Sequence, residues 1–494
     1  MNNTQRSMTI ALAGMSFITT IALGFTMTTQ AFAQNLFAPL VTREEVKQNF
    51  TTGFYHENRG ENELAKKYYQ KTIDLDTNFA LGYMAYGMME GVVSQRRQWI
   101  QKAMSKIEYA KTDYERFWIK GRNAVYGNGN ADDEFTSFDE MVKLYPNDAI
   151  ALYLLGFVYQ HHGRSQYQYA IEHLQKAIAL YPQFSMALNE LAYSFMETQQ
   201  FKKAEKILLK NIAAVPDKPH SYNSFADYLL RMGKYNQSIA YYQKVIKMDT
   251  TFPWAYIGQA ANLNFLAKYF AARSTLGHLE HLELTEREAW HQMQAYECSY
   301  IAEGKIDSAI IVLDKYAEAA RQKGRFTQQY IAHRNKTRIY FEIGDYVNGM
   351  KAYQIFNQMV TTNSQNESTK KQVADWGFYY RAYQAYLENK FSEADTLLAQ
   401  YGAQRFQHDD ASRNLRTKIL AKQENYTKAL ETLQQADTTN PYIQYLYGEV
   451  YMQMGKKSVA RKYAQSVINK NVMQDLEYHI ARAKSMKLLQ GKAK

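Results

Sequence analysis

The sequence predicts an all-α protein built from a repeated pair of helices, and three observations support this prediction. First, residues 149–216 contain two stretches that align with each other, and Pro146, Pro182 and Pro216 recur at intervals of 36 and 34 residues. A fixed period in this range indicates an array of small structural units. Second, no segment alternates apolar and polar residues between hairpin turns, so strands are not expected. Third, the 494 residues are 46% hydrophobic with only 7 prolines, which is sufficient for a long core.

The two aligned stretches carry similar residues at equivalent positions. Their apolar residues fall at i, i+3, i+4 and i+7, so each half of a stretch is expected to form one amphipathic helix. Small residues such as Gly156 and Ala170 allow the two helices of a pair to approach closely. Gly163 lies in the turn between them, and Pro182 ends the second helix because proline has no N–H to donate. The equivalent pairs are Leu152 with Leu188, Leu155 with Leu191, Gly156 with Ala192, Tyr159 with Phe195, Ala170 with Ala204 and Leu174 with Leu208.

Each stretch resembles a tetratricopeptide repeat. The resemblance implies antiparallel helix pairs, about 11–12 repeats in all, stacked into a right-handed superhelical solenoid. Neighbouring units must stack, because no pair can bury its apolar stripe alone. The family pattern of a large residue, Leu-Gly, Tyr, Ala, an aromatic or Leu, and Pro is present here as Leu152, Leu155, Gly156, Tyr159, Ala170, Leu174 and Pro182.

Weaker copies of the pattern extend over nearly the whole chain. We expect one array over 42–357, a polar loop over 358–370 that divides the protein, and a second array over 371–489. A final helix from Asp475 to Leu489 is expected to form a polar cap on the last repeat. Successive repeats are recognised at 42–76, 80–111, 115–146, 149–182, 183–216, 219–250 and from 253, and then by Tyr296 and Gly304, Tyr340 and Gly344, Ala382 and Ala394, Leu420 and Ala429, and Tyr447 and Ala460.

Residues 1–33 have the pattern of a secretory signal peptide. One positive charge, Arg6, precedes an uncharged and mostly apolar stretch, and Ala31 and Ala33 are the small residues that a signal peptidase recognises. Cleavage is predicted after Ala33, which places the mature chain in the periplasm or outside the cell, with no stable membrane span. The alternative is an uncleaved N-terminal membrane anchor, because the apolar stretch approaches the length of a membrane span.

Charge and cysteine content narrow the range of functions. The net charge of +11 is moderate for this length, and the basic residues are spread along the chain, so no nucleic-acid partner is expected. The single cysteine, Cys298, excludes an intramolecular disulfide and a cysteine zinc site. It has no charged partner in the sequence and is expected to be a small apolar filler.

No catalytic motif has a suitable context, so the sequence predicts a protein that is not an enzyme and holds no cofactor or metal. His278 and His281 could share a helix face as metal ligands, but an ordinary solvated face accounts for them. The pair His161–His162 suits a helix end. The acidic residues 132–134 begin a predicted helix, where their carboxylates would accept free backbone N–H groups.

The remaining candidate site is a groove. In the family that the sequence resembles, the first helices of the repeats line a concave face that binds extended peptides or partner helices. Transferred residue by residue, that face mixes aromatic side chains, which give large contact areas, with asparagines, which pair with a bound backbone. Packing within or between the repeats is the alternative for these aromatic residues. The predicted groove residues are Tyr153, Phe157, Asn189, Tyr193, Met196, Asn223, Asp227, Arg231, Trp254 and Ile257.

These features favour a non-enzymatic scaffold of the cell envelope or exterior, which binds a partner protein or extended peptide in its concave groove. The alternative is a protein that binds or processes a polysaccharide or another polymer, since aromatic rings also stack on sugars. Its candidate carboxylates are Glu197 and Asp227, from adjacent repeats. A third possibility is the sensory half of a signalling system that acts through a partner.

Overall fold

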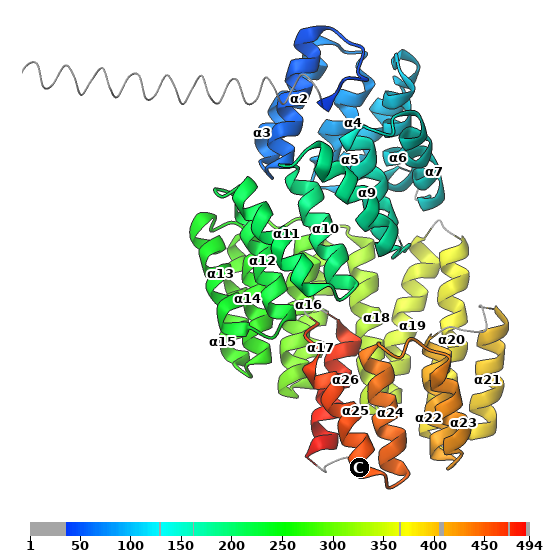
Figure 1. Cartoon of the computed structure of the whole chain (residues 1–494). Helices are drawn as coiled ribbons and strands as arrows, with labels where there is room; N and C mark the ends of the chain where they lie inside the picture. The colour runs from blue at the N-terminus through cyan, green and yellow to red at the C-terminus, as the bar shows by residue number, and fades with distance from the viewer. Residues whose placement is uncertain are drawn as a thin grey trace, which may run out of the picture. The chain divides into compact units, whose positions relative to one another are not determined.

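The computed structural model describes residues 36–490, apart from 128–129, 162, 365–366, 405–409 and 473–474. The predicted signal segment 1–33 and His162 lie outside the described residues. The described part contains twenty-five α-helices, two short 3-10 helices and no strand (Figure 1). The predicted all-α fold is therefore confirmed.

The described residues form two compact units, which divide between Tyr228 and Leu229 within one helix. The helices that begin in the first unit are α2 (Glu44–Asn58), α3 (Asn62–Leu75), α4 (Ala80–Met88), α5 (Val93–Met104), η1 (Ile107–Tyr109), α6 (Asp113–Tyr126), α7 (Ala131–Leu144), α8 (Ala149–Gln160), α9 (Tyr167–Leu180), α10 (Ser185–Glu197), α11 (Phe201–Ala214) and α12 (Pro219–Arg231). Those of the second unit are α13 (Tyr235–Met248), α14 (Pro253–Phe265), α15 (Tyr269–Gly277), η2 (His278–His281), α16 (Glu286–Glu303), α17 (Ile306–Gln322), α18 (Phe326–Ile343), α19 (Tyr346–Asn363), α20 (Glu367–Leu387), α21 (Phe391–Gln404), α22 (Asp410–Lys422), α23 (Tyr426–Gln434), α24 (Pro441–Gln453), α25 (Lys457–Asn469) and α26 (Leu476–Leu489).

Consecutive helices from α2 to α25 form twelve pairs, and α26 follows the last pair. From α2 to α11 and from α13 to α25, each helix packs against the next one in the chain. Close approach depends on small residues, as predicted for Gly156. A Cβ built at this position would lie 2.8 Å from Cγ of Leu174, closer than real atoms approach. The chain is thus a helical-repeat solenoid, which confirms the predicted architecture.

The turns inside the helix pairs from α10/α11 onward share one backbone geometry, which the residue types at the turns do not reveal. From α10/α11 to α24/α25, each of the eight pairs turns through one residue with positive φ, and the next residue donates its N–H to the carbonyl five positions before it. This arrangement satisfies the last carbonyls of the first helix. Only half of these positions are glycine, so a search for glycine alone misses the rest. The eight residues are Gln199, Gly233, Ala267, Gly304, Gly344, Asn389, Glu424 and Gly455.

The predicted division of the chain at 358–370 differs from the structure. Helix α19 continues to Asn363 and α20 begins at Glu367. Polar composition suggested a loop, but these side chains bond within the helix: Thr361 donates to the carbonyl of Asn357 at 2.9 Å, and Val360 anchors the segment in the core. The compact units divide instead at residues 228 and 229.

Helix α26 is present as predicted, but its polar character was wrong. It packs against α16, α24 and α25 of the second unit, and it buries residues on several sides. The Tyr478 ring is buried, and the His479 ring lies 6.3 Å from the ring of Phe265. A cap covers only the last repeat, whereas α26 joins the last pair to a pair far back in the sequence.

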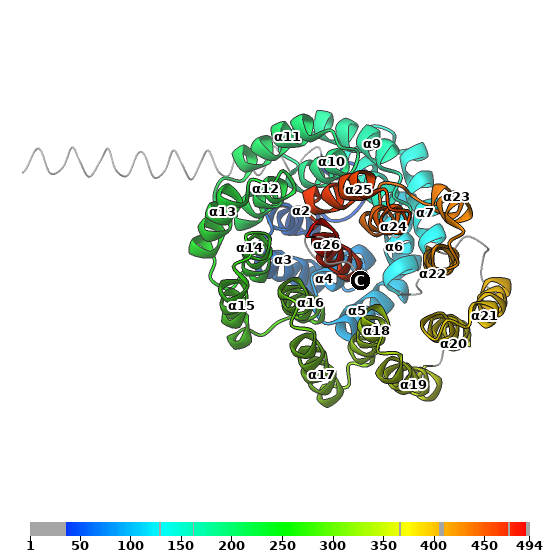
Figure 2. The same cartoon turned by 90° about the horizontal axis from the view of Figure 1, so that it is seen from below.

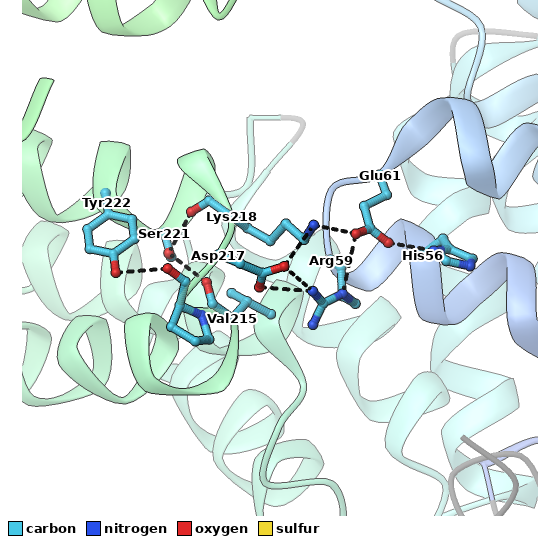
Figure 3. A network of polar contacts seen from close by, with 9 residues as sticks. His56, Arg59, Glu61, Val215, Asp217, Lys218, Ser221 and Tyr222 are labelled. Atoms are coloured by element: carbon cyan, nitrogen blue, oxygen red, sulfur yellow. Dashed lines mark hydrogen bonds and ion pairs between the residues drawn. The ribbon is translucent and has the colours of Figure 1, made fainter. Parts of the chain in front are cut away.

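The first unit also contains contacts between distant repeats. Figure 3 shows the turn after α2 meeting the turn before α12. The Arg59 guanidinium donates two hydrogen bonds to the Asp217 carboxylate, at 2.9 and 2.7 Å. Glu61 accepts from Lys218 and contacts His56 Nδ1 at 2.5 Å. These interactions link the first and sixth helix pairs of the chain.

We predict that Ala267→Gly stabilises the protein, with the free energy of unfolding rising by about 1 kcal/mol. Ala267 has φ of +56° and is exposed, so glycine relieves backbone strain without removing a packed side chain. Chemical denaturation followed by circular dichroism measures the change. The matched control is Ala399→Gly, at an exposed position inside α21, where the same substitution should cost about 1 kcal/mol. Loss of stability in both variants would contradict the proposed strain.

Candidate functional site

The ten predicted groove residues divide between the two units. Seven belong to the first unit, and Arg231, Trp254 and Ile257 belong to the second. Tyr153, Met196 and Ile257 are buried, with exposed fractions of 8%, 2% and 1%. Their burial agrees with the alternative of packing within or between repeats, and the Tyr153 ring lies 4.9 Å from the ring of Phe184 in the next repeat.

Three groove residues lie together on α10 and α12 of the first unit. Asn189 accepts a hydrogen bond from Ser224 at 2.6 Å, and the Tyr193 hydroxyl donates to the Asp227 carboxylate at 2.6 Å. These bonds join neighbouring first helices. Asp227, a candidate carboxylate for polymer processing, is thereby engaged by a tyrosine.

The remaining groove residues, Phe157, Asn223, Arg231 and Trp254, are partly exposed. The Trp254 ring lies 4.8 Å from the ring of His291. Nothing in these contacts tests partner binding, so the groove stays a prediction for all ten residues.

The acidic residues 132–134 illustrate a corrected detail. Helix α7 begins at Ala131, and its cap is Asn130, whose Oδ1 accepts from the N–H groups of Asp132 and Asp133 at 3.0 and 3.2 Å. The Asp132 carboxylate instead pairs with Arg164 at 2.7 Å. The neighbouring asparagine therefore performs the capping that was assigned to the acids.

The structure reveals a different candidate site, a cavity of about 210 Å³ in the second unit. In Figure 2 the first helices of this unit's pairs lie on the inner side of an arc, the second helices lie outside, and α26 lies within. The cavity is formed mainly by inner helices, and we call it the aromatic cavity. It is lined by Arg334, Arg338, Phe341, Glu342, Phe356, Trp376, Tyr379, Tyr380, Tyr383, Ala411, Asn414, Leu415, Lys418, Tyr442 and Glu477.

Helical periodicity explains how these residues come to one place. On α20 the lining residues are spaced i, i+3, i+4 and i+7, which puts them on one face of the helix. On α22 the lining residues have the same spacing. The first set is Trp376, Tyr379, Tyr380 and Tyr383, and the second is Ala411, Asn414, Leu415 and Lys418.

Aromatic rings make up most of the cavity wall. The rings of Phe341 and Tyr380 stack with centroids 5.0 Å apart, and the Trp376 ring lies 5.9 Å from Tyr380. Burial raises the pKa of the Tyr380 hydroxyl to about 12 and raises the pKa of Tyr379 well above its usual range. Both phenols are therefore neutral at physiological pH, and the wall presents flat rings with a few hydroxyl groups.

A buried ion cluster forms one side of the cavity. Lys418 Nζ lies 3.3 Å from Glu342 Oε1 and donates to the hydroxyls of Tyr383 and Tyr442 at 2.6 and 3.0 Å. Glu342 also accepts from Tyr442 at 2.5 Å and from Lys484 of α26 at 2.5 Å. The cluster thus joins α18, α20, α22, α24 and α26.

The charged groups of the cluster shift one another's pKa values strongly. Burial raises the pKa of Glu342, but Lys418 and Lys484 lower it more, so the carboxylate titrates well below its usual range. Burial lowers the pKa of Lys418, but Glu342 and Tyr383 raise it more. Both groups therefore stay charged at physiological pH, as an ion pair rather than as an acid–base couple.

Two further features of the lining are available to a bound group. Asn414 has an exposed fraction of 8%, and its Oδ1 is buried with no hydrogen-bond partner among the described residues. Arg334 is exposed, and Arg338 pairs with Glu477 of α26. The lining carries three cations and two carboxylates, which leaves one positive charge in excess.

Both carboxylates of the lining are held by cations, Glu342 by Lys418 and Lys484, and Glu477 by Arg338. Across the part of the chain that the structure describes, no group of three or more His, Cys, Asp or Glu residues is placed to hold a metal ion. Cys298 is buried, and burial raises the pKa of its thiol.

Comparison with known proteins identifies the repeats. Three stretches match tetratricopeptide repeat families, residues 150–183, 219–252 and 420–485. The chain is therefore a tetratricopeptide repeat protein. Such repeats are typical of scaffolds for protein–protein interaction, which are generally not enzymes.

Individual relatives are distant. The protein CTR9 homolog of Arabidopsis thaliana is 27% identical over 136 residues, which is 27% of this chain and only 12% of that protein. Among solved structures, a tetratricopeptide repeat protein from Parabacteroides merdae is 13% identical with a TM-score of 0.35, covering 54% of this chain and 99% of its own. The Pseudomonas aeruginosa pilF structure is 17% identical with a TM-score of 0.33, covering 42% and 91%. A monomeric mutant of IFIT1 is 15% identical with a TM-score of 0.41, covering 86% and 91%.

Among the helices that the structure describes, none is both long and apolar enough to cross a bilayer.

Sequence reasoning missed the aromatic cavity, although a signal for it exists. The segment from Trp376 to Tyr386 carries five aromatic residues besides Phe378, and the face that they share repeats the spacing of a core stripe. From sequence alone, aromatic residues at helical spacing indicate a buried core face. Their place at a cavity follows only from the tertiary structure, in which α18, α20, α22 and α26 contribute to one lining.

We predict that Glu342→Gln lowers the free energy of unfolding by about 3 kcal/mol, because it leaves the buried Lys418 ammonium without its carboxylate. The loss is measured by chemical denaturation at neutral pH. Glu388→Gln serves as control: it removes a pair with the exposed Lys390 at 2.7 Å, which is not a buried charge pair, and should leave the denaturation midpoint nearly unchanged.

The pH dependence gives a second check on the same variant. A carboxylate with a depressed pKa contributes stability above its unfolded pKa, and this contribution is lost as the pH falls through the folded value. The stability difference between the wild type and Glu342→Gln should therefore be full at neutral pH and shrink on strong acidification. A difference that is independent of pH would contradict the ion-pair role of Glu342.

Proposed function

We propose that this protein is an exported scaffold that binds a segment of a partner protein at the aromatic cavity of its second unit. The observation that carries the proposal is the cavity itself, in a face built from the first helices of tetratricopeptide repeats. Ligand sites are concave and mostly apolar, with a few placed polar groups, and the aromatic cavity meets this description.

The energetics of interfaces support an aromatic cavity as the centre of binding. A few residues carry most of the affinity in protein complexes, and they are enriched in Trp, Tyr and Arg. The lining holds Trp376, four tyrosines from α20 and α24, and two arginines of α18. In contrast, the buried members of the predicted groove are already packed, and Tyr193 and Asp227 are bonded to each other.

Export is proposed from the sequence of residues 1–33. The charge, the apolar stretch and the small residues at 31 and 33 support removal of this segment. The N-terminal sequence of the protein isolated from its native cells is expected to begin at Gln34, in the periplasmic or extracellular fraction. Recovery of intact Met1 in the cytoplasmic fraction would contradict export.

Partner binding at the cavity predicts a specific response to mutation. Residues 34–494 are used to capture proteins from solubilised envelope and culture supernatant, and the dominant protein is then purified and titrated against the chain. Trp376→Ala removes a wall of the cavity and should weaken binding at least tenfold, as expected for an aromatic anchor.

The matched control is Trp254→Ala, which removes a partly exposed tryptophan of the predicted groove. It should retain full affinity if the partner binds at the cavity. The reverse result, with binding lost only in Trp254→Ala, would move the site to the groove. Retention of polysaccharide in place of any protein would favour the polymer-binding alternative.

A further inference from the structure

The size of the aromatic cavity limits what enters it. Its volume is about 210 Å³. An engineered apolar cavity of about 150 Å³ holds one benzene molecule, and sites for drug-sized ligands begin at about 300 Å³. The aromatic cavity therefore accommodates one ring with a small polar substituent, and a chain of sugars does not fit inside it.

The wall favours an aromatic ring over an aliphatic group. Rings attract one another in edge-to-face and offset geometries, which adds to the gain from burial. The Trp376, Tyr379 and Tyr380 rings already adopt such geometries among themselves, with centroids 5.3 to 5.9 Å apart. A further ring placed among them extends the same packing.

Asn414 requires that a ligand of the cavity supply a hydrogen-bond donor. Its Oδ1 is a hydrogen-bond acceptor that is buried in the lining and has no donor among the described residues. A buried acceptor without a partner is costly, so a ligand that supplies an O–H or N–H is favoured over one that lacks it. Lys418 lies four residues further along the same helix face, but its ammonium group already contacts Glu342 and tyrosine hydroxyls. It therefore does not serve as the hydrogen-bond donor to Asn414.

The positive charge of the lining favours a ligand with a negative group beside the bound ring. The positive excess of the lining comes from α18, where Arg334 is exposed and its guanidinium lies 5.9 Å from the Tyr330 ring. Arg338 lies one turn further along the same face. A carboxylate beside the bound ring is therefore attracted, whereas a cation there is repelled.

Together, and resting on the proposed function, these requirements define the anchor of the partner. We propose that the aromatic cavity binds a tyrosine side chain of the partner, with its hydroxyl donating to Asn414 Oδ1 and an acidic neighbour facing Arg334. Phenylalanine fits the same space but leaves the acceptor unpaired. The site is thus specific for tyrosine flanked by an acidic residue.

The experiment uses capped dipeptides as probes against residues 34–494. Ac-Glu-Tyr-NH2 and Ac-Tyr-Glu-NH2 are compared with the corresponding phenylalanine peptides by ligand-observed NMR titration. The better of the two tyrosine peptides should bind about tenfold more tightly than its phenylalanine counterpart, as expected for pairing a buried acceptor. In Asn414→Leu this preference should disappear.

The chain offers a matched control for Asn414. Asn264 has the same exposed fraction of 8% and also a buried Oδ1 without a partner among the described residues, but it lies on α14, outside the cavity lining. Asn264→Leu should keep the tyrosine preference. Circular dichroism establishes that both variants are folded. In Arg334→Glu, binding of the acidic peptide should weaken while binding of Ac-Gln-Tyr-NH2 is unchanged.

Several outcomes would overturn the inference. These are equal affinity for the tyrosine and phenylalanine peptides, no binding at millimolar concentration, or displacement of the peptide by methyl glucoside. Failure here is distinguishable from failure of the proposed function. If partner binding requires Trp376 while the tyrosine preference is absent, only the anchor is wrong. If the tyrosine peptides bind as expected while Trp376→Ala retains the partner, only the proposed function is wrong.

Discussion

The second unit depends on one buried carboxylate. Glu342 contacts Lys418, Tyr442 and Lys484, which lie 76, 100 and 142 residues further along the chain. In a solenoid each repeat ordinarily contacts only its neighbours. The buried Glu342 carboxylate contacts three helices that are distant in the sequence, so it links repeats that do not stack on one another. Helix α26 supplies Lys484, the last member of the cluster.

This constraint also shapes the aromatic cavity. Because Lys418 is neutralised by Glu342, it supports the wall without offering a free charge to a ligand. The positive excess is left to Arg334 of α18, because Arg338 pairs with Glu477, and Asn414 Oδ1 has no hydrogen-bond partner among the described residues. The Glu342 cluster therefore decides that Lys418 is not available to a ligand. The polar groups that are available are the Asn414 acceptor in the wall and the positive charge on α18.

The repeat pattern was readable because it is local. Apolar spacing, small residues such as Gly156 and the terminal Pro182 act within one helix pair, so the sequence predicted the pairs and the final helix without knowledge of their packing. Local composition misled at 358–370, because polar side chains such as Thr361 bond back to the helix that contains them. It also misled in α26, whose charged residues conceal a helix that is buried on several sides.

The sequence by itself determined the all-α repeat architecture and the class of interaction scaffold, since both follow from periodicity within short segments. Only the tertiary structure decided where a candidate site lies. Trp376, Asn414 and Arg334 each occupy an ordinary helix face, and no spacing relates them along the chain. They meet because successive first helices stack and α26 folds back onto them, held by Lys484 on Glu342. Contacts between residues so far apart in the sequence depend on how all the intervening helices pack, whereas a sequence pattern reflects only interactions within short segments.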